Sequence, residues 1–345
     1  MRTMAGSSDV ISVVKADAYG HGSVEVARRL VAGGTASLAV AYTDEAKLLR
    51  DAGITLPIIV LFDQDGVDDY FRYDLVPVVR DLDSARRFSD EAVKRGSRLA
   101  VHMKIDTGMG RIGFLPGQAV ESAAAVSMMP GISLEGLMSH FSEADLADRT
   151  YAQHQLELFL RVRQELRERT GLQLFCHMAN SAALLSLPAA VFDGVRPGLA
   201  LYGYSPFHES YDLRPVMRIT ARILSLRDLP SGTPVSYGRT FITKRDSRIA
   251  VIPVGYADGY NRLFSNNADM LVQGSRVPVV GRVCMDMTML DVTDVPNVSE
   301  GDEVVILGRQ GQEMITAADL ATRINTIPYE ILTSLGTRAR KAYLN

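Results

Sequence analysis

Lys15 is the first residue in this sequence whose placement suggests chemistry, because it directly follows the apolar run Val10–Val14. Such a run predicts a strand that is covered on both faces, as in a parallel sheet. A lysine at the end of such a strand commonly extends outward into solvent. Alternatively, its surroundings lower the pKa of the amine, and the lysine acts as a nucleophile that forms a Schiff base. The rest of the chain has to decide between these two roles.

Further polar residues stand at the ends of other predicted strands. They include cations, imidazoles, an amide and a hydroxyl, which are groups that bind anions or exchange protons. If these strand ends meet at one face, the residues form a site for a small charged ligand. The residues are Lys104, Arg111, His140, His177, Asn180, Ser181 and Arg196.

The segment around Ser181 has features of a phosphate site. The run NSAALL predicts the start of a helix, and a hydroxyl beside a helix N-terminus can bind phosphate. By itself Ser181 is equally well explained as a helix N-cap. Gly198 allows a ligand to approach the backbone closely. A phosphate site together with a Schiff-base lysine suggests pyridoxal phosphate as the cofactor.

The elements that must position these residues alternate along the chain. Eight apolar strand-like runs are separated by helix-like runs over about 200 residues, which predicts parallel βα units. Eight such units fit a TIM (β/α)8 barrel, in which chemistry occurs at the carboxyl ends of the strands. A doubly wound sheet remains an alternative, because periodicity does not reveal barrel closure.

The pattern changes near the segment SPFHESYDLRP, after which strand-like runs predominate. We therefore predict a barrel domain over residues 1–214 and a mainly β domain over residues 215–345. The second domain closes with a predicted helix, TAADLATRIN, and a short tail. Its predicted strands lie within residues 216–229, 234–241, 248–257, 276–292 and 302–308.

Composition excludes several classes of protein. The chain has 345 residues, is 47% hydrophobic and carries a net charge of −3, with no basic run typical of nucleic-acid or membrane binding. No apolar run is long enough to span a bilayer, and the first ten residues lack the apolar core of a signal peptide. Cys176 and Cys284 lie in strand-like runs, which favours buried reduced thiols and a cytoplasmic location. The six histidines lack metal-ligand spacing, so we expect no metal site.

The segment GMGRIG, residues 108–113, matches the G-x-G-x-x-G pattern of dinucleotide-binding proteins. That fold requires a helix to begin inside the glycine loop. Pro116 and Gly117 follow closely and argue against an early helix. The glycines are better explained as shaping a loop that positions Arg111.

Whole motifs resemble those of the alanine racemase family, whose members are fold-type III pyridoxal phosphate enzymes. The resemblance runs in order from Val10 to the C-terminus, and it implies a TIM barrel followed by a β domain. The motifs are VVKADAYGHG, HMKIDTGMGRIG, HMANSAA, VRPGLALYG, PVSYG, VGYADGY, GRVCMDM and TIPYE.

The resemblance also implies roles at matching positions. Lys15 would bind pyridoxal 5′-phosphate covalently and act as one catalytic base, and Tyr237 from the partner subunit would act as the other. Lys104 matches a lysine that is carbamylated in many members and supports Arg111. Further cofactor-binding positions are Tyr19, His140, His177, Asn180, Ser181, Arg196, Gly198, Leu199 and Tyr329. Substrate-binding positions are Arg111, Met285 and Tyr256, and entryway positions are Asp145, Arg262 and Arg282.

The implied function is the interconversion of L- and D-alanine by a homodimer with shared active sites, which would supply D-alanine for peptidoglycan. Two bases on opposite faces of the substrate remove and return the α-proton. A tyrosine base requires a nearby cation, because the pKa of free tyrosine is about 10. Arg196 cannot give up its proton, so it would leave the cofactor's ring nitrogen unprotonated and limit side reactions such as transamination.

Alternative functions remain at this point. A serine racemase of the same family is less favoured, because relatives of that type tend to lack a tyrosine at position 329. A broad-specificity periplasmic racemase would need an export signal. A decarboxylase would carry an acid in place of Arg196, and the small pyridoxal-phosphate-binding proteins lack a second domain. A non-catalytic relative would be expected to have lost Lys15 or Tyr237.

Single residues also have ordinary explanations. Tyr237 and Tyr256 could be core or interface tyrosines, and His140 and His177 could be histidines with structural partners. The N-terminus departs from the family pattern, because only fourteen residues precede Lys15. We expect that a first strand and most of a helix are missing there, which would expose apolar surface on the β domain and lower its stability.

Overall fold

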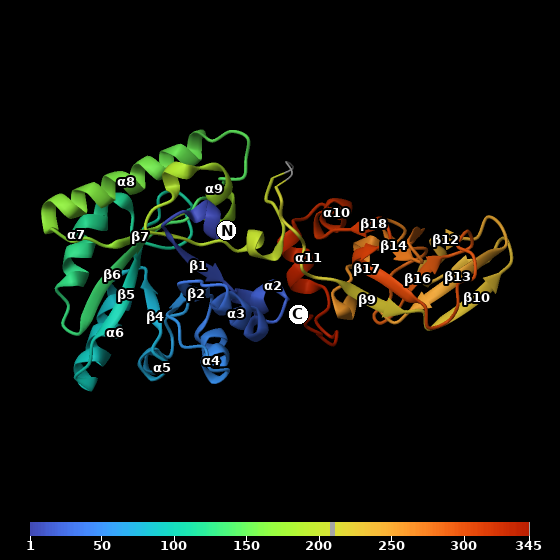
Figure 1. Ribbon diagram of the computed structural model, residues 1–345, viewed down its shortest axis with the longest axis horizontal. Helices are drawn as coiled ribbons and strands as arrows, with labels where there is room; N and C mark the ends of the chain where they lie inside the picture. The colour runs from blue at the N-terminus through green and yellow to red at the C-terminus, as the bar shows by residue number, and fades with distance from the viewer. Residues whose placement is uncertain (208–210, 345) are drawn as a thin grey trace. The chain divides into compact units, whose positions relative to one another are not determined.

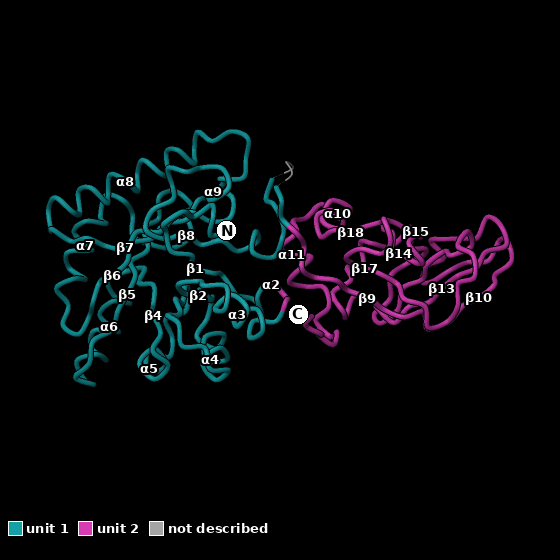
Figure 2. Tube along the Cα trace, viewed as in Figure 1, with its two compact units in different colours: residues 1–18, 22–213 teal, residues 19–21, 214–345 magenta. Residues whose placement is uncertain are grey.

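The structure is a computed structural model that describes residues 1–207 and 211–344. The chain divides into two compact units, shown in different colours in Figure 2. Unit 1 consists of residues 1–18 and 22–213, and unit 2 consists of residues 19–21 and 214–345.

Unit 1 contains a closed barrel of eight parallel strands in sequence order. The barrel closes through the pairing of β8 with β1, in which Gly194 lies opposite Asp9. This closure confirms the predicted TIM barrel and rules out the doubly wound alternative. The strands are β1 (Asp9–Val13), β2 (Ser37–Val40), β3 (Ile58–Val60), β4 (Val76–Val79), β5 (Leu99–Lys104), β6 (Ile132–Met138), β7 (Phe175–His177) and β8 (Gly194–Val195).

Helices surround these strands, as Figure 1 shows for α4 to α8. The barrel strands therefore have one face toward the barrel interior and one toward helices, which explains why every residue of β2 and β3 is buried. The helices are α1 (Arg2–Ala5), α2 (Lys15–Tyr19), α3 (Ser23–Ala32), α4 (Thr43–Asp51), α5 (Val67–Arg72), α6 (Leu82–Arg95), α7 (Pro116–Ser127), α8 (Thr150–Thr170) and α9 (Ser181–Ser186), with 3-10 turns η1 (Pro188–Ala190) and η2 (Leu199–Tyr202).

Helix α7 begins just outside the glycine-rich segment that resembles a dinucleotide loop. Its first residue is Pro116, which suits the first helical position because no backbone N–H is needed there. The helix therefore does not start inside residues 108–113, as a dinucleotide fold would require. This placement agrees with the rejection of a dinucleotide site.

Unit 2 is mainly β, as predicted, and its strands pair in the antiparallel sense throughout the described residues. One sheet has the order β10-β13-β16, another has β15-β14-β17-β18 with β9 also paired to β17, and β11 pairs β12. The strands are β9 (Ile219–Arg222), β10 (Ser225–Leu229), β11 (Pro234–Val235), β12 (Phe241–Ile242), β13 (Ser247–Ile252), β14 (Asp269–Val272), β15 (Ser275–Pro278), β16 (Thr288–Asp291), β17 (Glu303–Gln310) and β18 (Glu313–Ile315). The helical segments are η3 (Tyr237–Arg239), η4 (Tyr256–Asp258), η5 (Arg262–Phe264), α10 (Ala317–Arg323) and α11 (Pro328–Ser334).

The predicted single strand over residues 216–229 is two strands in two different sheets. The chain changes sheets at Ile223 and Leu224. The N–H of Ile223 donates to the backbone carbonyl of Asp302, and that of Leu224 donates to the backbone carbonyl of Val251. Residue periodicity continues through this change, so the sequence pattern did not reveal it. The sequence also did not predict β14, β18 and α11, which are all short.

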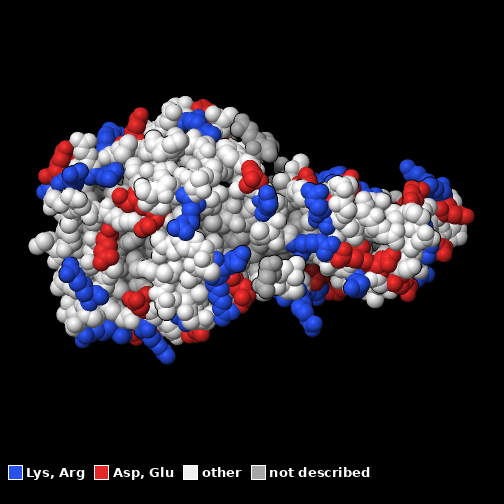
Figure 3. Space-filling view, viewed as in Figure 1, with Lys and Arg blue, Asp and Glu red and all other residues white. Residues whose placement is uncertain are grey.

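The two cysteines lie in different environments. Cys176 is buried in β7, whereas Cys284 is half-buried and lies outside any strand, which corrects the prediction for that residue. Within the described ranges, no helix is long and apolar enough to cross a membrane. On the face drawn in Figure 3, acidic and basic side chains are interspersed rather than separated by sign.

Candidate active site

Lys15 follows β1 and begins a tight left-handed turn. Ala16, Asp17, Ala18 and Tyr19 all have φ values of 52° or 53°. This conformation costs roughly 1–2 kcal/mol per residue, so other contacts must hold it. Such strained backbone is typical of functional sites.

Glu45 on α4 holds this turn from a neighbouring element. Its carboxylate accepts hydrogen bonds from the backbone N–H groups of Ala16 at 2.6 Å and Ala41 at 2.7 Å. The turn is also tied to α3, because the carboxylate of Asp17 accepts the N–H of Ser23 at 2.7 Å. Glu45 was not recognised from the sequence, and its spacing from Lys15 gives no local signal for this role.

The amine of Lys15 is half-buried among cations. Burial first, and then the positive charge of Arg111, lower the pKa of Lys15. Its Nζ lies 5.2 Å from the centroid of the Phe62 ring, and Cζ of Arg111 lies 5.5 Å from the same centroid. A lowered amine pKa favours the nucleophile over the outward-extending alternative.

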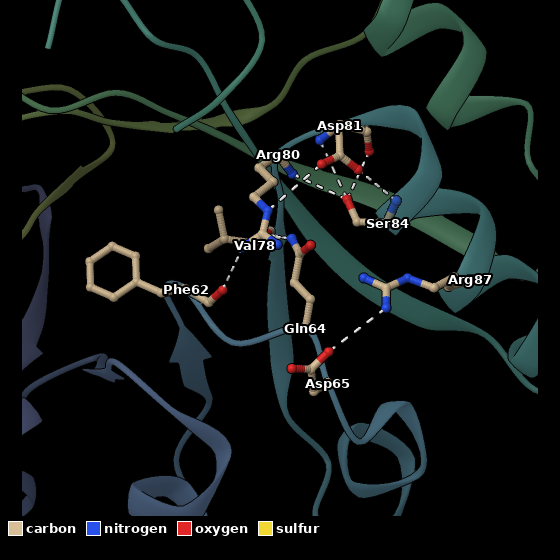
Figure 4. A network of polar contacts seen from close by, with 8 residues as sticks. All are labelled: Phe62, Gln64, Asp65, Val78, Arg80, Asp81, Ser84 and Arg87. Atoms are coloured by element: carbon tan, nitrogen blue, oxygen red, sulfur yellow. Dashed lines mark hydrogen bonds and ion pairs between the residues drawn. The ribbon is translucent and has the colours of Figure 1, made fainter. Parts of the chain in front are cut away.

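Phe62 is a site residue that sequence reasoning missed. Its carbonyl oxygen accepts a hydrogen bond from Nη1 of Arg80 at 3.0 Å, and Figure 4 shows its ring pointing away from that bond. Arg80 follows β4 directly before Asp81, whose carboxylate caps α6 by accepting the N–H of Ser84 at 2.7 Å. The available signal was position, because Phe62 stands just after β3 at the carboxyl end of the barrel.

Arg196 is held in the barrel by a nearly complete set of hydrogen bonds. Nη1 donates to Nδ1 of His177 at 2.8 Å and to the His177 carbonyl at 2.6 Å. Nη2 donates to the carbonyl of Ser139 at 2.5 Å, with longer contacts to Met178 and His140. Among the described residues, Nε is the one guanidinium nitrogen of Arg196 without a hydrogen-bond partner. The structure thus leaves one N–H donor available to a ligand.

Burial lowers the pKa of Arg196 to about 9, so the guanidinium remains charged at neutral pH. Besides burial, the positive charge of Arg196 lowers the pKa of nearby histidines. Burial and the charge of Arg196 hold the pKa of His140 and of His177 well below the usual value, and both imidazoles are neutral. The hydrogen bonds from Arg196 place an acceptor at Nδ1 of each ring.

Lys104 ends β5 and is buried, with 4% of its surface exposed. Its Nζ donates to the carbonyl of Ile105 at 3.2 Å. Burial, and secondarily the charge of Arg196, lower the pKa of Lys104 to about 7. Arg111 also lowers this pKa, so Lys15, Lys104, Arg111 and Arg196 form one electrostatically coupled group of cations. Such a group favours anions such as phosphate and carboxylate.

Asp106 organises the glycine-rich loop that carries Arg111. Its Oδ1 accepts the N–H groups of Gly108, Met109 and Gly110 at 2.8–3.1 Å, and its Oδ2 accepts that of Arg111 at 2.8 Å. Burial opposes ionisation, but these four donors hold the pKa of Asp106 below its ordinary value. The loop that carries Arg111 is therefore organised around the Asp106 carboxylate as well as by its glycines. Asp106 was not among the predicted site residues.

Asp106→Asn is expected to destabilise the protein by about 1 kcal/mol, because the amide either turns a donor toward the Arg111 N–H or loses an acceptor for the other loop N–H groups. The lowered folded-state pKa contributes stability above the ordinary value of 3.8, and this contribution is lost as pH falls through the folded-state pKa. The difference in melting temperature between parent and variant should therefore be largest near neutral pH and shrink toward about pH 3. Thermal scans across that range check this, with the exposed Asp90→Asn as control; a difference that grows toward acid would contradict it.

Ser181 lies at the start of α9 and contacts the segment after β8. Its Oγ accepts hydrogen bonds from the N–H groups of Gly198 at 2.9 Å and Ala200 at 3.2 Å. Asn180, not Ser181, caps α9, because its side chain accepts the N–H of Ala183 at 3.0 Å. The N-cap explanation of Ser181 is therefore wrong. Ser181, Gly198 and the adjacent Leu199 are brought together, and all three are buried.

The remaining predicted residues fall in unit 2, apart from Asp145, which is exposed in the segment after β6. Tyr19 and Tyr329 pack with ring centroids 5.8 Å apart. Tyr256 and Met285 lie on paired segments, since Tyr256 N–H donates to the Cys284 carbonyl and Ala257 N–H donates to the Met285 carbonyl, both at 3.0 Å. An open hollow of about 670 Å³ is lined by Tyr256, Gly259, Asn261, Arg262 and Ser334.

Tyr237 is exposed to 69% and lies on the short turn η3. The turn contacts the backbone at Arg282: Oγ of Ser236, the residue before Tyr237, donates to the Arg282 carbonyl at 2.6 Å. A Cβ at the following Gly238 would lie 3.1 Å from Cζ of Arg282. The guanidinium of Arg282 thus lies close to the backbone of Gly238, the residue that follows Tyr237.

Comparison with known proteins decides the family. A model described as "Alanine racemase, N-terminal domain" matches residues 1–206, and one described as "Alanine racemase, C-terminal domain" matches residues 216–343. The chain belongs to the alanine racemase family. This membership confirms the resemblance carried by the sequence motifs.

Individual alanine racemases support the assignment over nearly the whole chain. That of Thermodesulfovibrio yellowstonii is 48% identical over 344 residues, covering 100% of this chain and 92% of the relative. The structure from Streptomyces coelicolor is 34% identical with a TM-score of 0.94, covering 100% of this chain and 94% of that one. A Bartonella henselae alanine racemase with covalently bound pyridoxal phosphate is 29% identical with a TM-score of 0.90, covering 99% and 94%.

Proposed function

We propose that this protein interconverts L- and D-alanine, with pyridoxal phosphate bound covalently at Lys15. Beyond family membership, the observation that carries this proposal is the arrangement at the barrel mouth. There the pKa of Lys15 is lowered by burial and in part by the charge of Arg196. The guanidinium of Arg196 is fixed by hydrogen bonds, and its Nε–H has no acceptor among the described residues. A solved relative with covalently bound pyridoxal phosphate supports the same cofactor here.

The residues present fit this cofactor. The cations Lys15, Lys104, Arg111 and Arg196 favour an anionic group. The buried Ser181, whose Oγ already accepts the N–H groups of Gly198 and Ala200, has its own O–H left to donate to a phosphate. The Nε–H of Arg196 is available to the ring nitrogen. Because arginine only donates, it would meet an unprotonated ring nitrogen. Leu199, Asn180, Tyr19 and Tyr329 are the further residues proposed to contact the cofactor.

The chemistry that pyridoxal phosphate supplies when bound is withdrawal of electrons from the α-carbon, which acidifies the α-hydrogen. The protein must then remove a proton on one face and return one on the other. Lys15 is the base on one face, because its lowered pKa leaves a larger fraction of neutral amine. Tyr237, supplied by the partner subunit of a homodimer, is the proposed base on the other face.

Arg111 is proposed to bind the substrate carboxylate. The loop that carries it is held by the carboxylate of Asp106, so the guanidinium is delivered from an ordered backbone. Met285 and Tyr256 are proposed to complete the substrate site, and Asp145, Arg262 and Arg282 to line its entrance. His140 is neutral, with its Nδ1 facing Arg196, so its Nε2–H remains a donor within the site.

The function is tested by incubating purified protein with L-alanine and added pyridoxal phosphate and quantifying D-alanine. Parallel incubations with L-serine test the alternative substrate. Formation of D-alanine with a higher kcat/KM than D-serine supports alanine racemisation. A protein that binds pyridoxal phosphate and forms only D-serine, or no D-amino acid, would overturn the proposal.

Lys104 is proposed to be carbamylated and to support Arg111 in that form. Carbon dioxide reacts with the neutral amine, and a pKa of about 7 makes that form abundant slightly above neutral pH. We expect ¹³C-bicarbonate to label Lys104, with label increasing as pH rises from about 6 to 8. Carbon-13 NMR of the folded protein measures the signal, which Lys104→Arg should lack and the exposed-lysine control Lys94→Arg should retain. A signal that survives in Lys104→Arg would contradict this expectation.

A further inference from the structure

His102 is a buried histidine to which neither the motifs nor the proposed mechanism assigns a role. It lies on β5, and its Nδ1 is 2.9 Å from Nε2 of His177 on β7. His177 in turn contacts Arg196 through Nδ1 at 2.8 Å. All three side chains are buried, with 8%, 0% and 4% of their surfaces exposed respectively. Three residues from separate parts of the chain thus form one continuous hydrogen-bonded series.

The geometry determines where the protons of this series lie. Arginine only donates, so Nδ1 of His177 must be an acceptor and carries no proton. The single proton of the neutral His177 ring is therefore on Nε2, from which it is donated to Nδ1 of His102. His102 must then carry its own proton on its Nε2. In support, burial and the charge of Arg196 lower the pKa of His102 to about 4, which keeps this ring neutral.

The surrounding backbone is shaped to hold the His102 ring. Gly136 lies opposite His102 in the register of β5 and β6, and a Cβ there would lie 2.4 Å from Cγ of His102. The ring of Phe175 packs near it, with centroids 6.3 Å apart. Gly194 makes room for Phe175 in the same way, since its Cβ would lie 2.7 Å from that ring. Two glycines therefore create the space that this arrangement needs.

We propose that His102 is a positioning residue that acts on Arg196 through His177. By accepting a hydrogen bond from the Nε2–H of His177, it keeps Nδ1 of that ring as an acceptor for the guanidinium. The opposite tautomer would turn an N–H toward the donating Nη1 of Arg196 and push the guanidinium away. His102 thereby keeps the Nε–H of Arg196 directed to its ligand. The link to catalysis rests on the proposed function, whereas the tautomer is a property of the cofactor-free protein.

The first test uses the protein without cofactor and does not depend on catalysis. Nitrogen-15 NMR of labelled histidine rings distinguishes the two tautomers and reports whether the Nε2 proton of His177 is hydrogen-bonded. The parent and His102→Asn, whose side-chain oxygen stands near the place of Nδ1, should both show His177 protonated at Nε2 with a protected proton. His102→Leu should lose that protection or populate the other tautomer. Nδ1 protonation of His177 in the parent, or an unchanged signal in His102→Leu, would overturn the proposal.

The second test loads the same variants with pyridoxal phosphate. His102→Leu is expected to lower kcat for racemisation about tenfold with a smaller change in KM, as loss of a supporting hydrogen bond does elsewhere. It should also raise the yield of pyruvate, which forms when the amino group of alanine passes to the cofactor. His102→Asn should stay within about threefold of the parent in both quantities. Equal losses in the two variants would overturn the proposed role.

Gly136→Ala provides a variant in case His102→Leu does not fold. It leaves every member of the hydrogen-bonded series in place chemically but displaces the His102 ring, so we expect the signals of His102→Leu. Parent-like NMR signals and pyruvate yield in a folded Gly136→Ala protein would count against the proposal. If the NMR pattern holds while the parent forms no D-alanine, the proposed function fails and the positioning of Arg196 by His102 stands.

Discussion

Lys15→Ala is expected to abolish covalent attachment of pyridoxal phosphate and to reduce racemisation of alanine by at least about 10³-fold. The loss is large because one side chain supplies both the anchor for the cofactor and the base on one face of the substrate. The amine is suited to both tasks, since burial and the charge of Arg111 lower its pKa. Reduction of the loaded protein with borohydride followed by peptide mass analysis measures the attachment, and a D-alanine assay measures the rate.

The matched control is Lys94→Ala, which removes an exposed lysine whose ion pair with Glu91 lies on the surface of α6. This variant should behave as the parent, because exposed pairs of this kind contribute little. Retention of more than about a tenth of the parent rate by Lys15→Ala would show that another residue is the base. Attachment at a different lysine would contradict the assignment of the anchor.

Tyr237→Phe is expected to lower racemisation by about 10²–10⁴-fold, the usual contribution of a positioned acid or base. Lys15 remains in this variant, so exchange of the α-hydrogen with deuterated water should survive for one enantiomer of alanine and disappear for the other. Proton NMR of L- and D-alanine in deuterated water measures this directly. Tyr42→Phe, at an exposed tyrosine on unit 1, is the control. Equal exchange of both enantiomers would exclude Tyr237 as a base for one face.

The same two variants test whether the bases come from different subunits. In a mixture that exchanges subunits freely, half of the dimers contain one Lys15→Ala and one Tyr237→Phe chain. Each such dimer then has one intact site of its two, so activity should recover to about a quarter of the parent value. No recovery in a mixture shown to contain mixed dimers would place both bases in one subunit.

Much of unit 1 could be predicted because its strands are continuous apolar runs. Strands of a barrel covered by helices are buried on both faces, and β2 and β3 show this at every residue. Unit 2 was predicted less completely. The change of sheet at Ile223 and Leu224 depends on partners at Asp302 and Val251, which no local pattern reveals.

The candidate site was also predictable only in part. The residue types and their places at strand ends indicated Lys15, Arg196 and the other motif residues, whose roles stay predictions. Phe62 was missed because nothing in its own segment distinguishes it from an ordinary core residue, whereas Asp106 and His102 lie within the motif HMKIDTGMGRIG but were given no role there. Their contacts define them: a ring near two cations, a carboxylate with four backbone donors, and an imidazole against another imidazole 75 positions away.

By itself the sequence determined the eight alternating βα units, the β-rich second unit and the chemical groups at the strand ends, whereas closure of the barrel was decided by the pairing of β8 with β1. The first three features follow from local periodicity and residue type, which a single chain displays without knowledge of its contacts. Only the tertiary structure decided the state of those groups: the lowered pKa of Lys104, the neutral imidazoles and the Arg196 N–H that no described residue accepts. The physical reason is that burial and charge act through space, so residues far apart in the sequence set each other's protonation and orientation.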